Sequence, residues 1–350
     1  MVDFGQKGWK EFHLFYLTAW CNCFYVYYFC GLIFFIMTVW ILFIAAIVLF
    51  LALDLGVFNK TSHIIKSREA GIWTAIWVTL SFVFSGLIYW LYQHNYVDNP
   101  ENYTPAIASM KFITGYLIEL SLSVDNIFII AVIFSSFKIP QKYQHRVLFW
   151  GILGAIFFRG LMIFFGVILI NKFSWMTYVF GLFLLFTAAK MLFKKEEEQF
   201  NPKKSFVYRN LRKVMPVTMH MDGEHFFVKR RHITAATPLF VALVVIELMD
   251  VLFALDSVPA ILAITPDPFL VFSSNIFAIL GLRSMYFFLA HMLDKFKHLE
   301  YSLIAILSFV GIKMLLVHNY KFPEWVSLGF IAVALLIGIM VSLYGSKKEE

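Results

Sequence analysis

Long apolar stretches separated by short polar segments dominate the chain. A helix needs about 20 apolar residues to cross a bilayer core. Nine stretches meet this requirement, and they lie at 31–55, 71–92, 107–136, 147–170, 173–193, 237–264, 269–293, 301–318 and 323–344. The pattern therefore predicts an all-α, polytopic membrane protein with about nine transmembrane helices.

The N-terminal region is longer than one span requires. Residues 13–53 form one uncharged run, which at ~1.5 Å per residue is too long for a single span. Residues 1–30 are thus an aromatic segment that either lies at the interface or forms an extra span, and Lys7 and Lys10 weakly favour the extra span. A cleaved signal sequence fits less well, because the apolar run is too long and no small-residue cleavage site is evident.

Composition supports the membrane assignment. Of the 350 residues, 61% are hydrophobic and 15% are charged, whereas soluble domains have roughly 45–50% and about 25%. These values exclude an ordinary cytosolic enzyme, a disordered chain and a disulfide scaffold. The net charge of +7 comes from basic residues in short loops, which indicates contact with membrane lipid and not with nucleic acid. Cys21, Cys23 and Cys30 all lie in the N-terminal stretch and carry no redox information.

The loops predict the orientation of the chain. Basic and non-basic loops alternate, and the most basic is the segment 194–236. By the positive-inside rule this loop and the C-terminus are cytoplasmic. Within the loop, the sequence DGEHFFVKR at 222–230 suggests a small hairpin that is too short for a domain.

Three motifs occur twice in the same order. ELSLSVDN at 119–126 matches DVLFALDS at 250–257, GILGAIFFR at 151–159 matches NIFAILGLR at 275–283, and AAKML at 188–192 matches GIKML at 311–315. Each copy covers three spans, so residues 107–193 and 237–318 would enter the membrane from opposite sides. Such inverted repeats are typical of secondary transporters, which bind substrate near the midplane. Two leading helices at 31–106 and a last helix with a cytoplasmic tail at 319–350 complete the chain.

Five carboxylic acids fall inside apolar spans: Glu119, Asp125, Glu247, Asp250 and Asp256. A charge at a helix centre costs on the order of 2.5–3.5 kcal/mol, so these groups must be protonated, paired, hydrated or bound to a cation. A cation or proton site is the functional interpretation. Buried salt bridges and helix–helix hydrogen bonds are the structural alternative.

Helix geometry restricts which acids cooperate. Six positions separate Glu119 from Asp125 by ~9 Å and about 120° on an ideal helix. The two therefore hold one ion only if the helix is interrupted or if ligands come from the other repeat. Pro259 predicts an interruption of the span 237–264 beside Asp256, because proline lacks an N–H donor. Glu247 and Asp250 are three residues apart and share a face.

The available ligands indicate the kind of ion. Asn126 and Asn275 supply neutral oxygens at a similar depth, although an interhelical hydrogen bond explains each one equally well. Carboxylate and amide oxygens suit Mn²⁺, Mg²⁺ or Ca²⁺ better than Zn²⁺ or Cu⁺. The candidate metal ligands are thus Glu119, Asp125, Asn126, Glu247, Asp250, Asp256 and Asn275.

Four basic residues also lie in the spans. Arg159 and Arg283 are deep enough to be counter-charges of the acids, or else purely structural partners. Lys190 and Lys313 are near span ends, where a lysine can extend its charge to the interface. No G-x-x-x-x-G-K-[ST] loop is present, so we expect no ATP drive by this chain. We also expect no cofactor and no enzymatic activity, and protein partners cannot be inferred.

The motifs together resemble the TerC family of integral membrane proteins, the tellurium-resistance or Alx-like group. The resemblance rests on LALDLGVF, ELSLSVDNIF, YQHRVLFWGILGA, TPLFVALVVIELMDVLFALDSVPAI and DPFLVFSSNIFAILGLRSMYF, and it runs from about residue 40 to the C-terminus. It implies a bacterial-type inner-membrane protein related to LysE-type exporters, with manganese efflux, tellurite resistance or metallation of exported enzymes among its members. The family's acidic pairs map onto Glu119, Asp125, Asp250 and Asp256.

Three functional hypotheses follow. The leading one is export of a divalent cation, Mn²⁺ above all, by alternating access through an acidic midplane site. A membrane scaffold linked to tellurium resistance or metallation, without transport, is the second. An intramembrane aspartyl protease is the third, but the contexts SVDN and ALDS contain no GxGD motif.

Overall fold

The structure is a computed structural model that describes residues 37–52, 67–173, 175–193, 216–218, 223–230, 233–290, 299–316 and 322–349. Two compact units divide the chain: residues 1–60 with 91–99, and residues 61–90 with 100–350. The aromatic segment 1–30 and most of the loop 194–236 lie outside the described residues, so the statements about them stay predictions.

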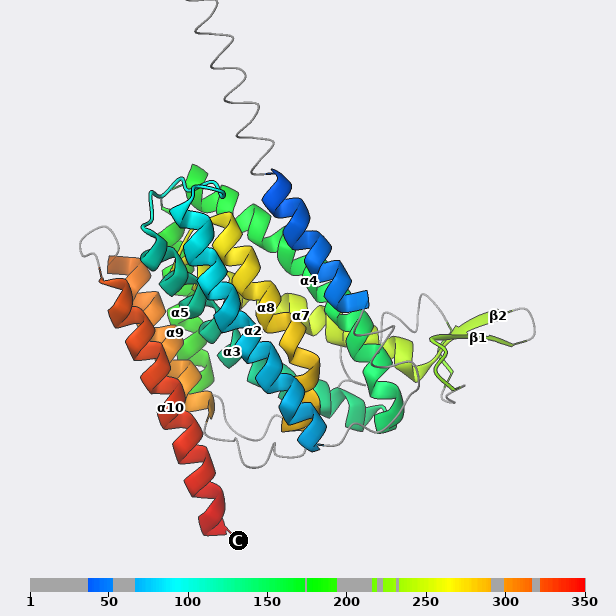
Figure 1. Ribbon diagram of the computed structural model, residues 1–350. Coiled ribbons are helices and arrows are strands. Elements are labelled where there is room, and N and C mark those ends of the chain that lie inside the picture. The colour runs from blue at the N-terminus through cyan, green and yellow to red at the C-terminus, as the bar shows by residue number, and fades with distance from the viewer. Residues whose placement is uncertain are drawn as a thin grey trace, which may run out of the picture. The chain divides into compact units, whose positions relative to one another are not determined.

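Helices account for almost all of the described chain (Figure 1). After the helix Met37–Ala52 come α2 (Ser67–Gln93), α3 (Pro105–Ser136), α4 (Gln141–Lys172), α5 (Met176–Leu192), α7 (Pro238–Leu262), α8 (Pro268–Leu289), α9 (Leu299–Leu316) and α10 (Glu324–Glu349). In the described part, six helices are long and apolar enough to cross a membrane: α2, α3, α4, α7, α8 and α10. The shorter apolar helices fall on the three remaining predicted spans. An all-α membrane protein is thus confirmed, and the number of nine spans stays a prediction.

Three helices begin at a capping residue followed by proline. Thr104, Thr237 and Asp267 precede the prolines that open α3, α7 and α8. The Asp267 carboxylate accepts hydrogen bonds from the backbone N–H groups of Phe269 at 2.9 Å and Leu270 at 3.2 Å. Proline costs a helix nothing at its first position, where no intrahelical donor is needed. These pairs therefore fix where each helix starts.

The helices of the second unit pack in three cross-pairs, α3 with α8, α4 with α7, and α5 with α9. Each pair joins one helix from residues 107–193 to one from 237–318. This is the pairing that two related three-helix segments would produce, although the inverted repeat itself stays a prediction. Helix α8 is buried along nearly its whole length, whereas α4 exposes Phe157, Phe164 and Phe165, as a lipid-facing surface requires.

Glycines allow the close contact between α5 and α9. A β-carbon on Gly311 of α9 would lie 3.0 Å from the Gly181 carbonyl oxygen of α5 and 2.9 Å from the Leu185 side chain. Small residues at such crossings let membrane helices approach each other backbone to backbone. The α5–α9 pair therefore depends on the absence of side chains at these two positions.

The predicted break at Pro259 is wrong. Helix α7 continues from Pro238 to Leu262 with Pro259 inside it, and α3 is also continuous past Asp125. Pro259 lies three residues before the end of α7, so the helix loses only the hydrogen bond to the Leu255 carbonyl before it ends. The ligands that complete a site around Glu119 must then come from other helices.

The basic loop does contain a hairpin, but it lies further along the chain than predicted, because only its first strand falls within residues 222–230. Strands β1 (Phe227–Arg230) and β2 (Ile233–Ala236) pair antiparallel, with Phe227 opposite Ala236. The hydroxyl of Thr237 donates to the carbonyl oxygen of His225 at 2.8 Å, which holds the hairpin at the start of α7.

Candidate functional site

Four polar residues from four helices meet inside the bundle, three of them buried and the fourth, Asp250, partly buried. Glu119 comes from α3, Arg159 from α4, Asp250 from α7 and Asn275 from α8. Two of these helices belong to each half of the predicted repeat. We call these four residues the Arg159 cluster.

Arg159 holds the cluster together, and only 1% of it is exposed. Its Nε and Nη2 atoms donate to the two carboxylate oxygens of Asp250 at 3.0 and 2.7 Å. Its Nη1 atom forms an ion pair with Glu119 and donates to Asn275 Oδ1 at 3.4 Å. The Asn275 amide in turn donates to the second oxygen of Glu119 at 3.2 Å. The two-pronged contact with Asp250 is the geometry for which guanidinium is suited and ammonium is not.

The charges of the cluster do not cancel. Two carboxylates face one guanidinium, so the cluster has one excess negative charge when both acids are ionised. Glu119 is fully buried, whereas the Asp250 side chain is 15% exposed. Buried ionic groups are tolerated only when they are well paired, and the excess charge therefore favours a cation. Asp250 is therefore the more accessible of the two acids.

A cavity of about 30 Å³ adjoins the cluster. Its lining includes Asp250 and Asn126, together with apolar residues of α3, α4, α7 and α8. The amide nitrogen of Asn126 is buried and has no hydrogen-bond partner among the described residues. A cavity of this size holds a water molecule and, by its volume, a bare cation. The cavity thus offers the Asp250 carboxylate and the Asn126 amide to a small polar guest.

Glu247 lies one turn before Asp250 on α7 and packs against α4. A β-carbon on Gly154 would collide with the Glu247 carboxylate, so the glycine makes the space that the carboxylate occupies. Glu247 Oε2 is buried without a hydrogen-bond partner in the described part of the chain.

Asp256 is placed differently. Its carboxylate accepts a hydrogen bond from the Thr187 hydroxyl of α5 at 3.0 Å. The described contacts of Asp256 are therefore with α5 and not with the Arg159 cluster. The Asp125 side chain lies outside what the structure describes, so its part in the site stays a prediction.

The two buried arginines have different surroundings. Arg159 pairs with two of the predicted acids, as a counter-charge would. Arg283 of α8 is hydrogen-bonded to His145 Nε2 of α4 at 3.2 Å. The neighbouring Tyr286 hydroxyl donates to Gln144 Oε1 at 3.0 Å, so the two contacts form a second polar layer between α4 and α8.

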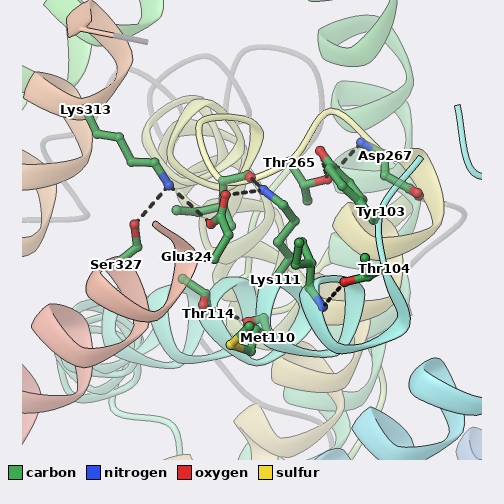
Figure 2. A network of polar contacts seen from close by, with 12 residues as sticks. Tyr103, Thr104, Met110, Lys111, Thr114, Thr265, Asp267, Lys313, Glu324 and Ser327 are labelled. Atoms are coloured by element: carbon green, nitrogen blue, oxygen red, sulfur yellow. Dashed lines mark hydrogen bonds and ion pairs between the residues drawn. The ribbon is translucent and has the colours of Figure 1, made fainter. Parts of the chain in front are cut away.

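A third polar network was not anticipated from the sequence. Lys111 of α3, Lys313 of α9 and Glu324 of α10 meet near Tyr103 and Thr265 (Figure 2). The expected extension of Lys313 to the interface is wrong, because its side chain is only 7% exposed and contacts Glu324. Lys111 and Glu324 each lie within one or two turns of the start of a helix, where charged residues commonly face the membrane interface. The sequence therefore gives little sign that they form a buried network.

Within the described residues, no three His, Cys, Asp or Glu side chains gather as a metal-binding group. A cation site built from this part of the chain would therefore use Glu119 or Asp250 with the amide oxygens of Asn126 and Asn275. The two acids already share one partner in Arg159.

Fold and site define a class: a multi-pass α-helical membrane protein with an acid–arginine cluster buried between its helices. Comparison with known proteins gives the family, since the profile of the Integral membrane protein TerC family matches residues 105–350. The chain belongs to the TerC family.

Relatives match over most of their length. An uncharacterized membrane protein of Myxococcus xanthus is 49% identical over 88% of this chain and 92% of its own. Another from Rickettsia bellii is 42% identical over 87% of this chain and 96% of its own. A protein of Escherichia coli K12 named "Putative membrane-bound redox modulator Alx" is 44% identical over 88% of this chain and 95% of its own. No solved structure matches the chain.

Proposed function

We propose that this protein exports a divalent metal cation, with Mn²⁺ as the substrate, through the bacterial inner membrane by alternating access. The observation that carries the proposal is the Arg159 cluster, in which acids from both halves of the predicted repeat share one guanidinium. In the proposed orientation, the hairpin end of the bundle and the C-terminus are cytoplasmic.

The chemistry of the cluster supports a hard cation. Glu119, Asp250, Asn126 and Asn275 offer only oxygen as a ligand atom, which favours Mn²⁺, Mg²⁺ or Ca²⁺ over Zn²⁺. In the absence of the cation, Arg159 pairs with both acids. An arriving cation competes with Arg159 for the oxygens of Asp250, so binding requires the guanidinium to withdraw.

The position of the cavity supports uptake from the cytoplasmic side. The residues of α3 that line it, Asn126, Ile129 and Ile130, follow Glu119 toward the end of the helix at Ser136. On α7, Ile246 and Met249 precede Asp250 toward the hairpin. The cavity therefore lies between the Arg159 cluster and the end that carries the basic loop.

The test is Mn²⁺ flux in proteoliposomes for the wild type and Asp250→Asn, with Asp98→Asn as the matched control. Asp98 is an exposed loop residue, so the control removes one carboxylate charge at a position outside the helices. We expect Asp250→Asn to lower flux at least tenfold and Asp98→Asn to leave it within twofold. Equal flux in all three proteins would refute the proposal. Competition by Zn²⁺ stronger than that by Mg²⁺ or Ca²⁺ would refute the assignment to a hard cation.

The name of the Escherichia coli relative suggests a second function, modulation of redox state. The three cysteines of this chain are at positions 21, 23 and 30, ahead of the residues that match the family. Thiol chemistry would therefore have to come from the N-terminal segment.

A scaffold role in tellurium resistance or metallation predicts that deletion of residues 200–230 abolishes function while Asp250→Asn does not.

A further inference from the structure

Lys111 is a buried cation with three different partners (Figure 2). Only 5% of the residue is exposed. Its Nζ atom donates to the Ile264 carbonyl oxygen at 2.5 Å and to a Glu324 carboxylate oxygen at 2.8 Å. It also lies 4.7 Å from the centre of the Tyr103 ring, within range of a cation–π contact. The amine is thus held by α10, by the segment after α7 and by the segment before α3.

Lys313 uses the same carboxylate. Its Nζ atom lies 3.4 Å from the other oxygen of Glu324 and 2.9 Å from Ser327 Oγ. Glu324 therefore bridges a lysine of α3 and a lysine of α9, with each of its oxygens on one amine. We call Lys111, Lys313 and Glu324 the Glu324 clasp.

The surroundings of the clasp keep its charges paired. Burial raises the pKa of the Tyr103 hydroxyl well above its ordinary value of 10, so Tyr103 stays a neutral phenol near neutral pH and does not compete for the lysines. Removing one partner of a buried ion pair leaves an uncompensated charge, which is strongly unfavourable. The clasp therefore resists separation of the three helices.

Helix α3 relates the clasp to the candidate site. Lys111, Glu119 and Asn126 follow one another along this helix, so the clasp, the Arg159 cluster and the cavity succeed each other at intervals of about 10–12 Å. The cavity lies on one side of the Arg159 cluster, and the clasp lies on the other. Glu324 belongs to neither predicted three-helix segment, yet it ties α3 of the first to α9 of the second.

We propose that the Glu324 clasp is the gate that closes the exit end of the transport path. This inference rests on the proposed function, because a gate needs a path to close. Rocking of the two three-helix segments would have to pull Lys111 or Lys313 away from Glu324. The cation would then leave through the space that opens between α3, α9 and α10, and the clasp would re-form once the cation had left.

The test measures access to a position between the clasp and the Arg159 cluster. Thr114 lies between Lys111 and Glu119 along α3, is 1% exposed, and among the described residues its hydroxyl donates to the Met110 carbonyl oxygen of its own helix. We would introduce Thr114→Cys into the full chain with Cys21, Cys23 and Cys30 replaced by serine. A charged methanethiosulfonate reagent would be supplied to both faces of the membrane, so that the result does not depend on the proposed orientation.

With the clasp intact, we expect Thr114→Cys to react slowly. Glu324→Gln removes the shared charge and should raise the labelling rate at least tenfold. The matched control is Glu101→Gln, an exposed acid in the loop before α3, which should leave the rate unchanged. If Glu324→Gln does not give folded protein, Lys313→Met breaks one arm of the clasp and should raise the rate in the same direction.

Equal labelling rates with and without Glu324→Gln would overturn the gate. This outcome differs from failure of the proposed function, in which Asp250→Asn leaves Mn²⁺ flux unchanged whatever the labelling rates are. Faster labelling together with Asp250-dependent flux supports both proposals.

Discussion

Replacement of Arg159 by methionine tests the logic of the Arg159 cluster most directly. The substitution keeps most of the side-chain volume and removes the guanidinium. Glu119, which is fully buried, would lose its ion pair, and Asp250 would lose both of its hydrogen bonds to Arg159. The two acids would then face each other without a counter-charge.

The expected cost follows from these contacts. Breaking a buried ion pair by removing one partner destabilises a protein by about 3–5 kcal/mol. Most of this cost should come from Glu119, because the Asp250 side chain is 15% exposed and can be hydrated. The double variant Glu119→Gln with Arg159→Met should therefore recover about 2 kcal/mol.

A bound cation should reverse the effect. A ligand present at 100 times its dissociation constant stabilises the folded state by about 2.7 kcal/mol. On the proposed function, part of the binding energy of Mn²⁺ in the wild type would be used to displace Arg159. The Arg159→Met protein has no such competitor, so Mn²⁺ should stabilise it more than it stabilises the wild type.

The assay is thermal unfolding in detergent, followed by the fluorescence of the nine tryptophans, with and without Mn²⁺. Arg146→Met on the same helix is the control, because Arg146 pairs with Glu224 at 3.5 Å while both side chains are 38% exposed. Such a pair contributes about 0–1 kcal/mol. The reasoning fails if Arg159→Met unfolds at the same temperature as Arg146→Met without metal. It also fails if Mn²⁺ shifts the wild type and Arg159→Met equally.

Two glycine substitutions, with a third as the control, test the packing of the helices. Gly311→Leu would drive a side chain into the Gly181 backbone at the α5–α9 crossing and should destabilise the protein by about 1–3 kcal/mol in thermal unfolding. The control is Gly329→Ala, which has open space around it and should be neutral or slightly stabilising. Equal effects of the two substitutions on stability would show that the α5–α9 crossing is not tight. Gly154→Ala would displace the flexible Glu247 carboxylate and not a backbone. It should therefore lower Mn²⁺ flux while it leaves the unfolding temperature nearly unchanged. Unchanged flux would exclude Glu247 from the transport path.

The sequence alone predicts the parts of this fold that depend on hydrophobic length. Every predicted span overlaps a helix, because a stretch of 20 apolar residues has few alternatives to a membrane helix. Buried acids are also visible in sequence, since a carboxylate in an apolar stretch is costly and needs a reason. Glu119 and Asp250, chosen on this basis, do meet in the structure through Arg159.

The sequence does not reveal which other residue each buried charged side chain contacts. Asp256 has the same spacing to Asp250 as Asp125 has to Glu119, yet it contacts Thr187 of α5. Lys313 is near a helix end, which predicts an interfacial charge, but Glu324 of the next helix approaches it from the side. Such contacts depend on which faces of two helices meet, and hydropathy contains no information about helix rotation.

The sharing of Arg159 between two acids links the occupancy of the site to helix packing. Its guanidinium joins α4 to α7 through Asp250 and α4 to α3 through Glu119. On the proposed function, a cation that takes over these oxygens frees α4 from both contacts and brings α3 and α7 together around one ion. Binding and the loosening of α4 are then a single event, which is what alternating access requires, because a ligand shifts a conformational equilibrium only by its difference in affinity for the two states. A lysine at position 159 could not serve in the same way, since one ammonium cannot hold both oxygens of Asp250 while it also pairs with Glu119.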